Sequence, residues 1–160
     1  MDQPNKPIKR SKELVQLSKD HHEGLLFGWK IKQGLRNGTD TKVISRFIQW
    51  FWDADLKEHF DKEEQVLAPH LPNENENVQR MFAEHEEIEA LVQINAMIPD
   101  ADIFLQLADK LNDHIRFEER ILFPFAEKVI PQAELEELAR ELLVTKPKEV
   151  WKEEFWLRKN

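Results

Sequence analysis

Apolar residues recur every three or four positions along most of this chain, which is the spacing of amphipathic α-helices. Turn-forming residues interrupt the pattern at Asn37-Gly38, between Pro69 and Pro72, and at Pro99. No stretch shows the strict alternation that is typical of a β-strand. The pattern therefore predicts four long helices, over about 11–37, 41–68, 74–97 and 101–130.

Short connections between long helices indicate an all-α fold of the antiparallel up-down-up-down four-helix bundle type. The composition agrees, because glycine is scarce, tyrosine is absent, and Leu, Glu, Lys and Ala are plentiful. After Pro131 the shorter amphipathic segment QAELEELARELL predicts a short additional C-terminal helical segment. The 160 residues are expected to form one domain over 1–160, with the bundle at about 11–130 and a C-terminal extension at about 131–160.

A histidine lies on the apolar stripe of each predicted helix, and three of these four histidines have a glutamate four residues later. Two segments repeat one another, HFDKEEQVLAP at 59–69 and HIRFEERILFP at 114–124. Four residues turn a helix by about 400°, so each glutamate lies about 40° around from its histidine and one turn along. Both side chains should then point into the bundle. The candidate metal-ligating residues are His21, His59, Glu63, His85, Glu89, His114 and Glu118.

Three ionised carboxylates in one core layer would each cost several kcal/mol and would repel one another. A pair of divalent cations removes this difficulty, because their charge balances the carboxylates. Imidazole mixed with carboxylate suits iron or manganese better than zinc or calcium. The directly following Glu64 and Glu119 are turned by about 140° and should face solvent or lie behind the ligands. The pattern thus predicts a dinuclear metal centre.

Any single pair of histidine and glutamate has a simpler interpretation as a hydrogen-bonded polar pair in the core. A bundle with a polar core and no metal is therefore the alternative, but four histidines in one pattern favour the metal. Of the two adjacent histidines, His21 shares the stripe of Leu17 and Gly28 and is preferred over His22 as the ligand. His70 falls at a helix end between prolines, so we expect it to lie outside the ligand set.

The segments SKDHHEGL, HFDKEE, EHEEIE and HIRFEE together resemble the hemerythrin-like family, also called the HHE cation-binding domain. The resemblance covers about 14–124 and implies an antiparallel four-helix bundle that holds an oxo- or hydroxo-bridged pair of iron ions. By position, it implies terminal imidazole ligands at His21, His59, His85 and His114 and bridging carboxylates at Glu63 and Glu118.

One position departs from the oxygen-carrying hemerythrins, which offer two histidines four residues apart on the third helix. This chain has His85 followed by Glu89 instead. An extra carboxylate ligand favours ferric iron, so reversible oxygen carriage is disfavoured. The expected function is binding or sensing of O2 or a related small diatomic or peroxide ligand. Two iron ions are the expected cofactor, with manganese or zinc as alternatives.

Two other functions stay open, namely a di-iron oxidase or peroxidase and a structural bundle with an optional metal site. Ferritin-type enzymes place a glutamate three residues before a histidine, and none of the six histidines here has one. The chain also lacks the tyrosine that a tyrosyl-radical mechanism requires. A binding protein is therefore favoured over an enzyme.

The net charge, the absence of cysteine and the absence of a long apolar stretch limit the partners and the location that we expect for the protein. With 31 acidic and 23 basic residues the net charge is −8, so neither nucleic acid nor an anionic membrane is expected as a partner. The absence of cysteine excludes disulfides and iron–sulfur clusters. No apolar stretch suits a signal peptide or a membrane span, and a cytoplasmic protein is expected.

Overall fold

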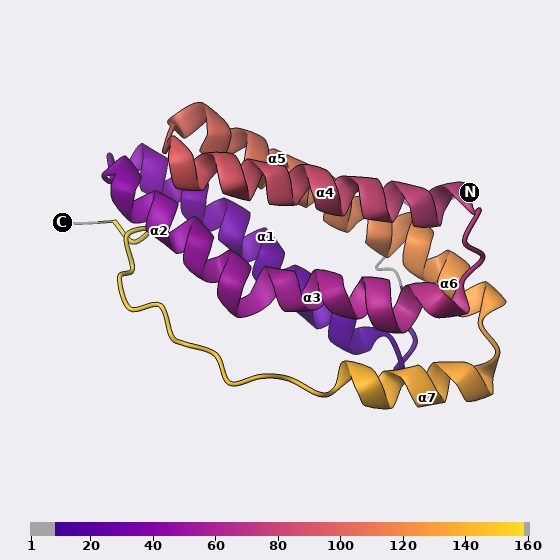
Figure 1. The fold of residues 1–160 in the computed structure, drawn as a ribbon. Helices are drawn as coiled ribbons and strands as arrows, with labels where there is room; N and C mark the ends of the chain where they lie inside the picture. The colour runs from indigo at the N-terminus through magenta and orange to yellow at the C-terminus, as the bar shows by residue number, and fades with distance from the viewer. Residues whose placement is uncertain (1–8, 159–160) are drawn as a thin grey trace.

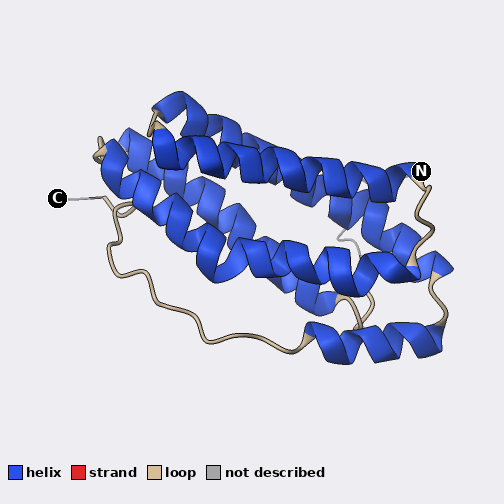
Figure 2. Cartoon of the chain, in the orientation of Figure 1, coloured by secondary structure: helices blue, strands red, loops and turns tan. Residues whose placement is uncertain are grey.

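The computed structural model describes residues 9–158, and every regular element in that range is helical (Figures 1 and 2). The all-α prediction is therefore confirmed. The α-helices are α1 (Val15–Arg36), α2 (Thr41–Phe51), α3 (Lys57–Lys62), α4 (Glu76–Met97), α5 (Ala101–Phe117), α6 (Phe123–Val129) and α7 (Gln132–Leu142). Short helical turns of other kinds join some of them, namely the π-helical η1 (Trp52–Leu56), η2 (Glu63–Leu67) and η4 (Glu118–Leu122) and the 3-10 turn η3 (Ala68–His70).

These elements join into four long helical rods within the described range. The first rod is α1, the second runs without a break over 41–70, the third is α4, and the fourth runs over 101–129. α1 packs against α5, α5 against α4, and α2 against both α4 and α1. Figure 1 shows the rods lying side by side, with α7 alongside one end of the bundle. The predicted helices match the rods closely.

The turns form where the sequence predicts them, because suitable capping residues stand there. Gly38 adopts a φ of 71°, which only glycine accepts readily, and so ends the first rod. The side chain of Asp40 then accepts a hydrogen bond of 2.9 Å from the backbone N–H of Lys42 and begins the second rod. Asp100 caps α5 in the same way through the N–H of Asp102, at 2.6 Å.

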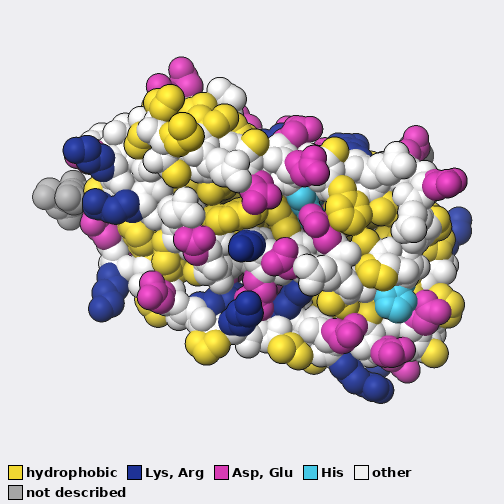
Figure 3. Space-filling view, viewed as in Figure 1, with side chains coloured by type: hydrophobic (Ala, Val, Ile, Leu, Met, Phe, Trp, Pro, Cys, Tyr) yellow, Lys and Arg dark blue, Asp and Glu magenta, His cyan; other side chains and the backbone are white. Residues whose placement is uncertain are grey.

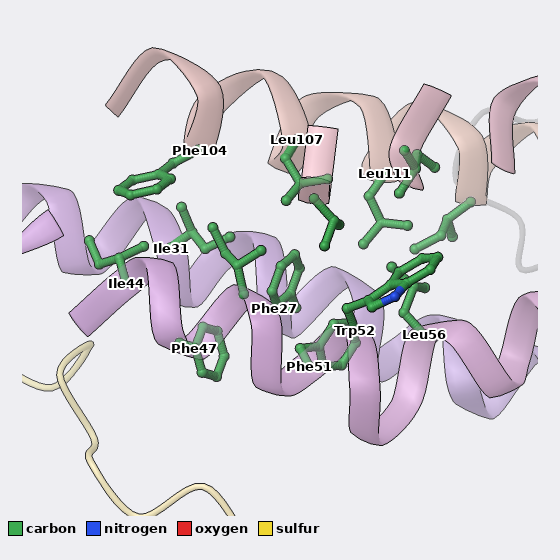
Figure 4. Close-up of a cluster of buried hydrophobic side chains, with 14 of the residues drawn as sticks. Phe27, Ile31, Ile44, Phe47, Phe51, Trp52, Leu56, Phe104, Leu107 and Leu111 are labelled. Carbon is green, nitrogen blue, oxygen red and sulfur yellow. The ribbon is translucent and has the colours of Figure 1, made fainter. Parts of the chain in front are cut away.

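Two clusters of buried apolar side chains fill the bundle, one toward each end. The first cluster, shown in Figure 4, contains Phe27 and Ile31 of the first rod and Phe47 and Phe51 of the second. The second cluster takes its members from the opposite ends of the same rods and is covered by α7. The predicted polar positions of each rod fall between the two clusters, so the apolar core encloses a polar layer near its middle.

The predicted C-terminal helical segment is α7, and the chain then continues as an extended segment over 143–158, which we call the strap. Figure 1 shows the strap in yellow, running back along the second rod. Its end is fixed by Phe155, whose ring lies so close to Gly34 that a Cβ there would approach it to 2.6 Å. No helix among residues 9–158 is long and apolar enough to span a bilayer.

Candidate metal centre

Six of the seven candidate ligands meet in the polar layer and form two overlapping groups. Within each group, the ligand atoms all lie within 4.8 Å of one another, and every member is buried. The first group is His21, His59, Glu63 and Glu118, and the second is Glu63, His85, His114 and Glu118. Each rod contributes one histidine, so the layer is built by all four rods together.

Glu63 and Glu118 belong to both groups and lie at the centre of the layer. One oxygen of Glu63 lies 3.2 Å from His59 Nε2 and 3.1 Å from His85 Nε2. The oxygens of Glu118 lie 2.9 Å from His21 Nε2 and 3.2 Å from His114 Nε2. Each carboxylate therefore contacts one imidazole of each group and lies between the two groups.

Each shared glutamate is the first residue of a π-helical turn, η2 or η4. The backbone N–H of Glu63 still bonds the carbonyl of His59, and that of Glu118 the carbonyl of His114. Each glutamate thus lies one turn beyond its histidine and points the same way. π-helical turns occur often at functional sites. The two copies of the repeated segment consequently fold alike.

The Nδ1 atom of each imidazole contacts a further carboxylate on the side away from the centre. We call these four residues the outer carboxylates. The pairs are Asp20 with His59 at 3.0 Å, Glu64 with His85 at 2.7 Å, Glu84 with His114 at 2.7 Å, and Glu119 with His21 at 2.8 Å. Each contact joins one rod to the next, and the four together close a circuit around the bundle. Carboxylates in this position orient a metal-binding imidazole and increase its basicity.

Two of the outer carboxylates were expected from the sequence and two were not. Glu64 and Glu119 lie behind the ligands, one of the two placements expected for them. Asp20 and Glu84 were missed, although each directly precedes a candidate ligand histidine in the sequence. An acidic residue directly before a candidate ligand histidine is therefore the sequence pattern from which Asp20 and Glu84 could have been predicted.

The charges of the layer stabilise one another. Burial alone would raise the pKa of the Glu118 carboxyl, but the charge of His114 and close contacts with the imidazoles of His114, His21 and His59 hold that pKa well below its usual value. Burial likewise disfavours the charged form of His114, yet Glu118 and Glu84 raise its pKa to about 9. The layer is therefore a place where positive charge is strongly favoured.

Several of the possible ligand atoms in the layer are left without hydrogen bonds to one another, which a bound metal ion would compensate. Glu63 Oε2, Glu118 Oε2, His59 Nε2 and His114 Nε2 are buried and have no hydrogen-bond partner among the described residues. Unpaired buried polar atoms are costly, and cations between them would satisfy all four. This observation supports a metal in each group from the structure alone.

Glu89 is the one candidate ligand that the structure does not bring to the layer. Its side chain is exposed and belongs to neither group. α4 continues as a regular α-helix through this position, whereas Glu63 and Glu118 each begin a π-helical turn. The structure therefore brings six of the seven candidate ligands together and leaves Glu89 outside both groups. On α4, the buried acid beside His85 is Glu84 instead.

The structure also distinguishes His21 from the two histidines that were not candidate ligands, His22 and His70. His21 is buried in the layer, while the adjacent His22 is exposed. His70 is half-buried at the end of the second rod, where its Nδ1 lies 3.1 Å from a carboxylate oxygen of Glu134 in α7. The structure therefore places His21 in the layer and leaves His22 and His70 outside it.

A small cavity lies against one side of the layer. It has a volume of about 40 Å³, and its walls include His21, His59 and His114. Gly24 also lines it, and a Cβ at this position would come within 2.8 Å of Ile115 Cδ1. A site for one water needs about 10–15 Å³ on this scale, so the cavity has room for a ligand of two or three atoms.

The outer carboxylates give the first testable prediction. Glu84→Gln keeps the size of the side chain but removes the charge beside His114 Nδ1, so we expect metal affinity to fall by about 10- to 100-fold. Competition with a chelator of known affinity measures this change. Glu86→Gln is the control, because Glu86 is exposed on the same helix. Equal affinities of the two variants would contradict a role of the outer carboxylates.

Comparison with known proteins supports the cation-binding interpretation. A family model described as "Hemerythrin HHE cation binding domain" matches residues 13–126. A curated relative, "DNA nickase" from Nostoc sp. (strain PCC 7120), is 31% identical over 121 residues, which cover 71% of this chain and 34% of the relative. The chain thus spans about a third of that relative's length. No solved structure matches significantly.

Proposed function

This chain belongs to the hemerythrin HHE cation-binding family, and on that premise we propose that its polar layer holds two iron ions and binds a small oxygen-containing ligand such as O2 or peroxide. The observation that carries the proposal is the sharing of Glu63 and Glu118 between two groups of ligands. Two carboxylates at the centre of four imidazoles suit two neighbouring cations better than one. The family also supports the antiparallel up-down-up-down order of the rods as part of this proposal.

In this proposal His21 and His59 hold one cation, His85 and His114 hold the other, and the two shared carboxylates hold both. Each group offers two imidazoles and two carboxylates, which leaves coordination positions free for a further ligand. Iron in such a site would supply electrons to a bound oxygen species, and manganese would suit the same donors. The outer carboxylates keep the imidazoles oriented and basic.

The cavity supports a small ligand in particular. Its walls place Phe51, Leu56 and Leu111 beside three of the four imidazoles, so a ligand there is shielded from bulk water. The volume of about 40 Å³ suits a ligand of two or three atoms. The chain has no tyrosine, so an oxidase mechanism that uses a tyrosyl radical is disfavoured.

The name of the Nostoc relative reports DNA nicking for a protein about twice as long as this chain. We propose no such activity for this chain. Its net charge is −8, and on the face shown in Figure 3 basic side chains lie among acidic ones. A DNA-binding surface needs clustered basic residues to neutralise phosphates. A plasmid-nicking assay of the metal-loaded protein should therefore show no nicked product.

Metal analysis of protein purified under native conditions tests the central proposal. We expect two iron ions per chain and a charge-transfer absorption band in the near ultraviolet. A spectrum that changes reversibly with O2 would indicate a carrier, while continuous consumption of peroxide would indicate an enzyme. Less than about half a metal ion per chain after reconstitution would contradict the proposal, because a preformed site should load readily.

A pair of histidine variants tests which residues hold the metal. His59→Ala removes a buried imidazole of the layer and should lower metal affinity by about tenfold or more. His70→Ala is the control, because His70 lies at the far end of the second rod and its Nδ1 contacts Glu134 rather than the layer. Isothermal titration calorimetry with ferrous ion under anaerobic conditions measures the metal affinity of both variants. Loss of metal from the His70 variant with retention in the His59 variant would refute the assignment.

A further inference from the structure

The strap crosses the bundle beside the small cavity. Lys148 of the strap lines that cavity together with Asp20, Asp55 and His59. The ammonium of Lys148 forms an ion pair with the carboxylate of Asp55 in η1. Burial alone would lower the pKa of Lys148, but Asp55 and the nearby Asp20 raise it, so the ammonium stays charged. A charged side chain of the strap therefore forms part of the cavity wall.

Few contacts hold the middle of the strap in place. Residues 145–150 make no backbone–backbone hydrogen bond with any described residue, and the ring of Trp151 directly beyond them packs against Phe47 and Trp50. The contacts near Lys148 are its ion pair and the hydrogen bond of 2.9 Å that Trp50 Nε1 donates to the carbonyl of Glu149. A segment with so few hydrogen bonds opens more readily than the helices beneath it.

Firm attachments lie at both ends of the strap instead. At one end, Lys62 Nζ donates a hydrogen bond of 3.0 Å to the carbonyl of Leu142. At the other end, the ring of Phe155 packs at 5.1 Å from that of Phe47, and Asn37 donates to the Phe155 carbonyl at 3.2 Å. The strap can therefore lift in the middle without detaching.

Space beneath the strap permits such a movement. A groove of about 770 Å³ separates it from the second rod and is lined by Lys57, Val66, Val144 and Lys146 among others. Lys148 borders both this groove and the cavity. A half-exposed ion pair such as Lys148 with Asp55 contributes little free energy, so it can break often.

We propose that the strap is a lid over the candidate metal centre and that the ion pair between Lys148 and Asp55 is its latch. Opening of the latch exposes the cavity beside His21 and His59 and admits a ligand of two or three atoms. This inference rests on the proposed function, since it assigns the route by which a small ligand reaches that centre. It assigns Lys148 control over the rate of exchange and not over the strength of binding.

Azide binding to the oxidised, iron-loaded protein tests the lid, with absorbance followed by stopped flow. Lys148→Ala and Asp55→Asn each break the latch, so we expect azide association and dissociation to accelerate together by about fivefold. Trp50→Phe keeps an aromatic ring but loses the hydrogen bond to Glu149, and should accelerate both rates as well. Lys146→Ala is the control, because Lys146 borders the groove but not the cavity.

Rates of the latch variants within about twofold of the unaltered protein would overturn the lid, as would slower association. A change in Kd with only one rate altered would also overturn it, because Lys148 would then act on the bound ligand. Iron content and the azide spectrum of the unaltered protein are recorded first. Failure to load iron would count against the proposed function, whereas normal loading with unchanged rates would count against the lid alone.

Discussion

Glu118→Gln should release both cations from the layer, while Glu89→Gln should leave both in place. Glu118 is fully buried, and its oxygens lie within 4.0 Å of the Nε2 atoms of all four imidazoles, from 2.9 Å for His21 to 4.0 Å for His59. Among the described residues, no other side chain of the layer lies within 4.0 Å of the Nε2 atoms of all four imidazoles; Glu63 reaches those of His59 and His85. Loss of Glu118 should therefore affect the two cations together.

Glutamine preserves the shape of Glu118 but carries no charge and offers one oxygen in place of two. A metal loses a shared anionic ligand, so we expect affinity to fall by more than about 100-fold, beyond the loss typical of an outer residue. Elemental analysis of the reconstituted variants measures the ions retained per chain.

Glu89 is a matched control for this experiment, because it too stands four residues after a histidine of the layer. Its exposed position means that Glu89→Gln should bind as many ions as the unaltered protein. Two ions retained by Glu118→Gln would refute the shared-carboxylate arrangement. Loss of ions from Glu89→Gln would show that α4 rotates when metal binds.

Removal of the metal should lower the melting temperature by about 5–10 °C. Ligand present at about 100 times its Kd stabilises a fold by about 2.7 kcal/mol, and each kcal/mol shifts the melting temperature of a protein of this size by about 2–4 °C. The physical cause is the burial of Glu63 and Glu118, whose carboxylates have no exposed surface and need a positive partner. Circular dichroism melts of loaded and chelator-treated protein measure the difference.

The difference in melting temperature between the metal-loaded and the metal-free protein should widen as pH rises from 6.5 to 9. Without metal, the positive partners are protonated imidazoles, and the folded pKa of His114 is about 9 against an ordinary value of 6.5. A raised folded pKa means that this contribution is complete below pH 6.5 and is lost as pH rises through about 9. Metal also competes with fewer protons at higher pH. A difference in melting temperature that narrows as pH rises would contradict this account. Glu118→Gln is the control, and its melting temperature should not change when metal is added.

The sequence predicted the helices and most of the centre because helical periodicity fixes which side chains share a face. His21, His59, His85 and His114 lie on the apolar stripes that the spacing indicated, and the structure brings them together. Such a prediction needs only the rise and rotation per residue, which hardly vary among α-helices.

The same periodicity could not separate Glu89 from Glu63 and Glu118, since all three follow a histidine by four residues. Two of them begin π-helical turns and face inward, while the third stands on an uninterrupted helix and faces outward. The choice depends on the packing of neighbouring rods, which a single-helix argument does not include. The path of the strap over the second rod could not be predicted for a related reason, because an irregular segment has no period from which to infer its neighbours.

The circuit of outer carboxylates has a consequence for how the bundle selects one alignment of its helices. Apolar surfaces tolerate sliding, because a leucine shifted by one turn, about 5.4 Å, can still find apolar neighbours. The contacts of Asp20, Glu64, Glu84 and Glu119 do not tolerate it, since each acid reaches a single ring nitrogen on the next rod. A slip of any one rod would break two of these contacts and leave two buried imidazoles without their carboxylates, so the polar layer fixes the vertical alignment of all four rods before any cation arrives.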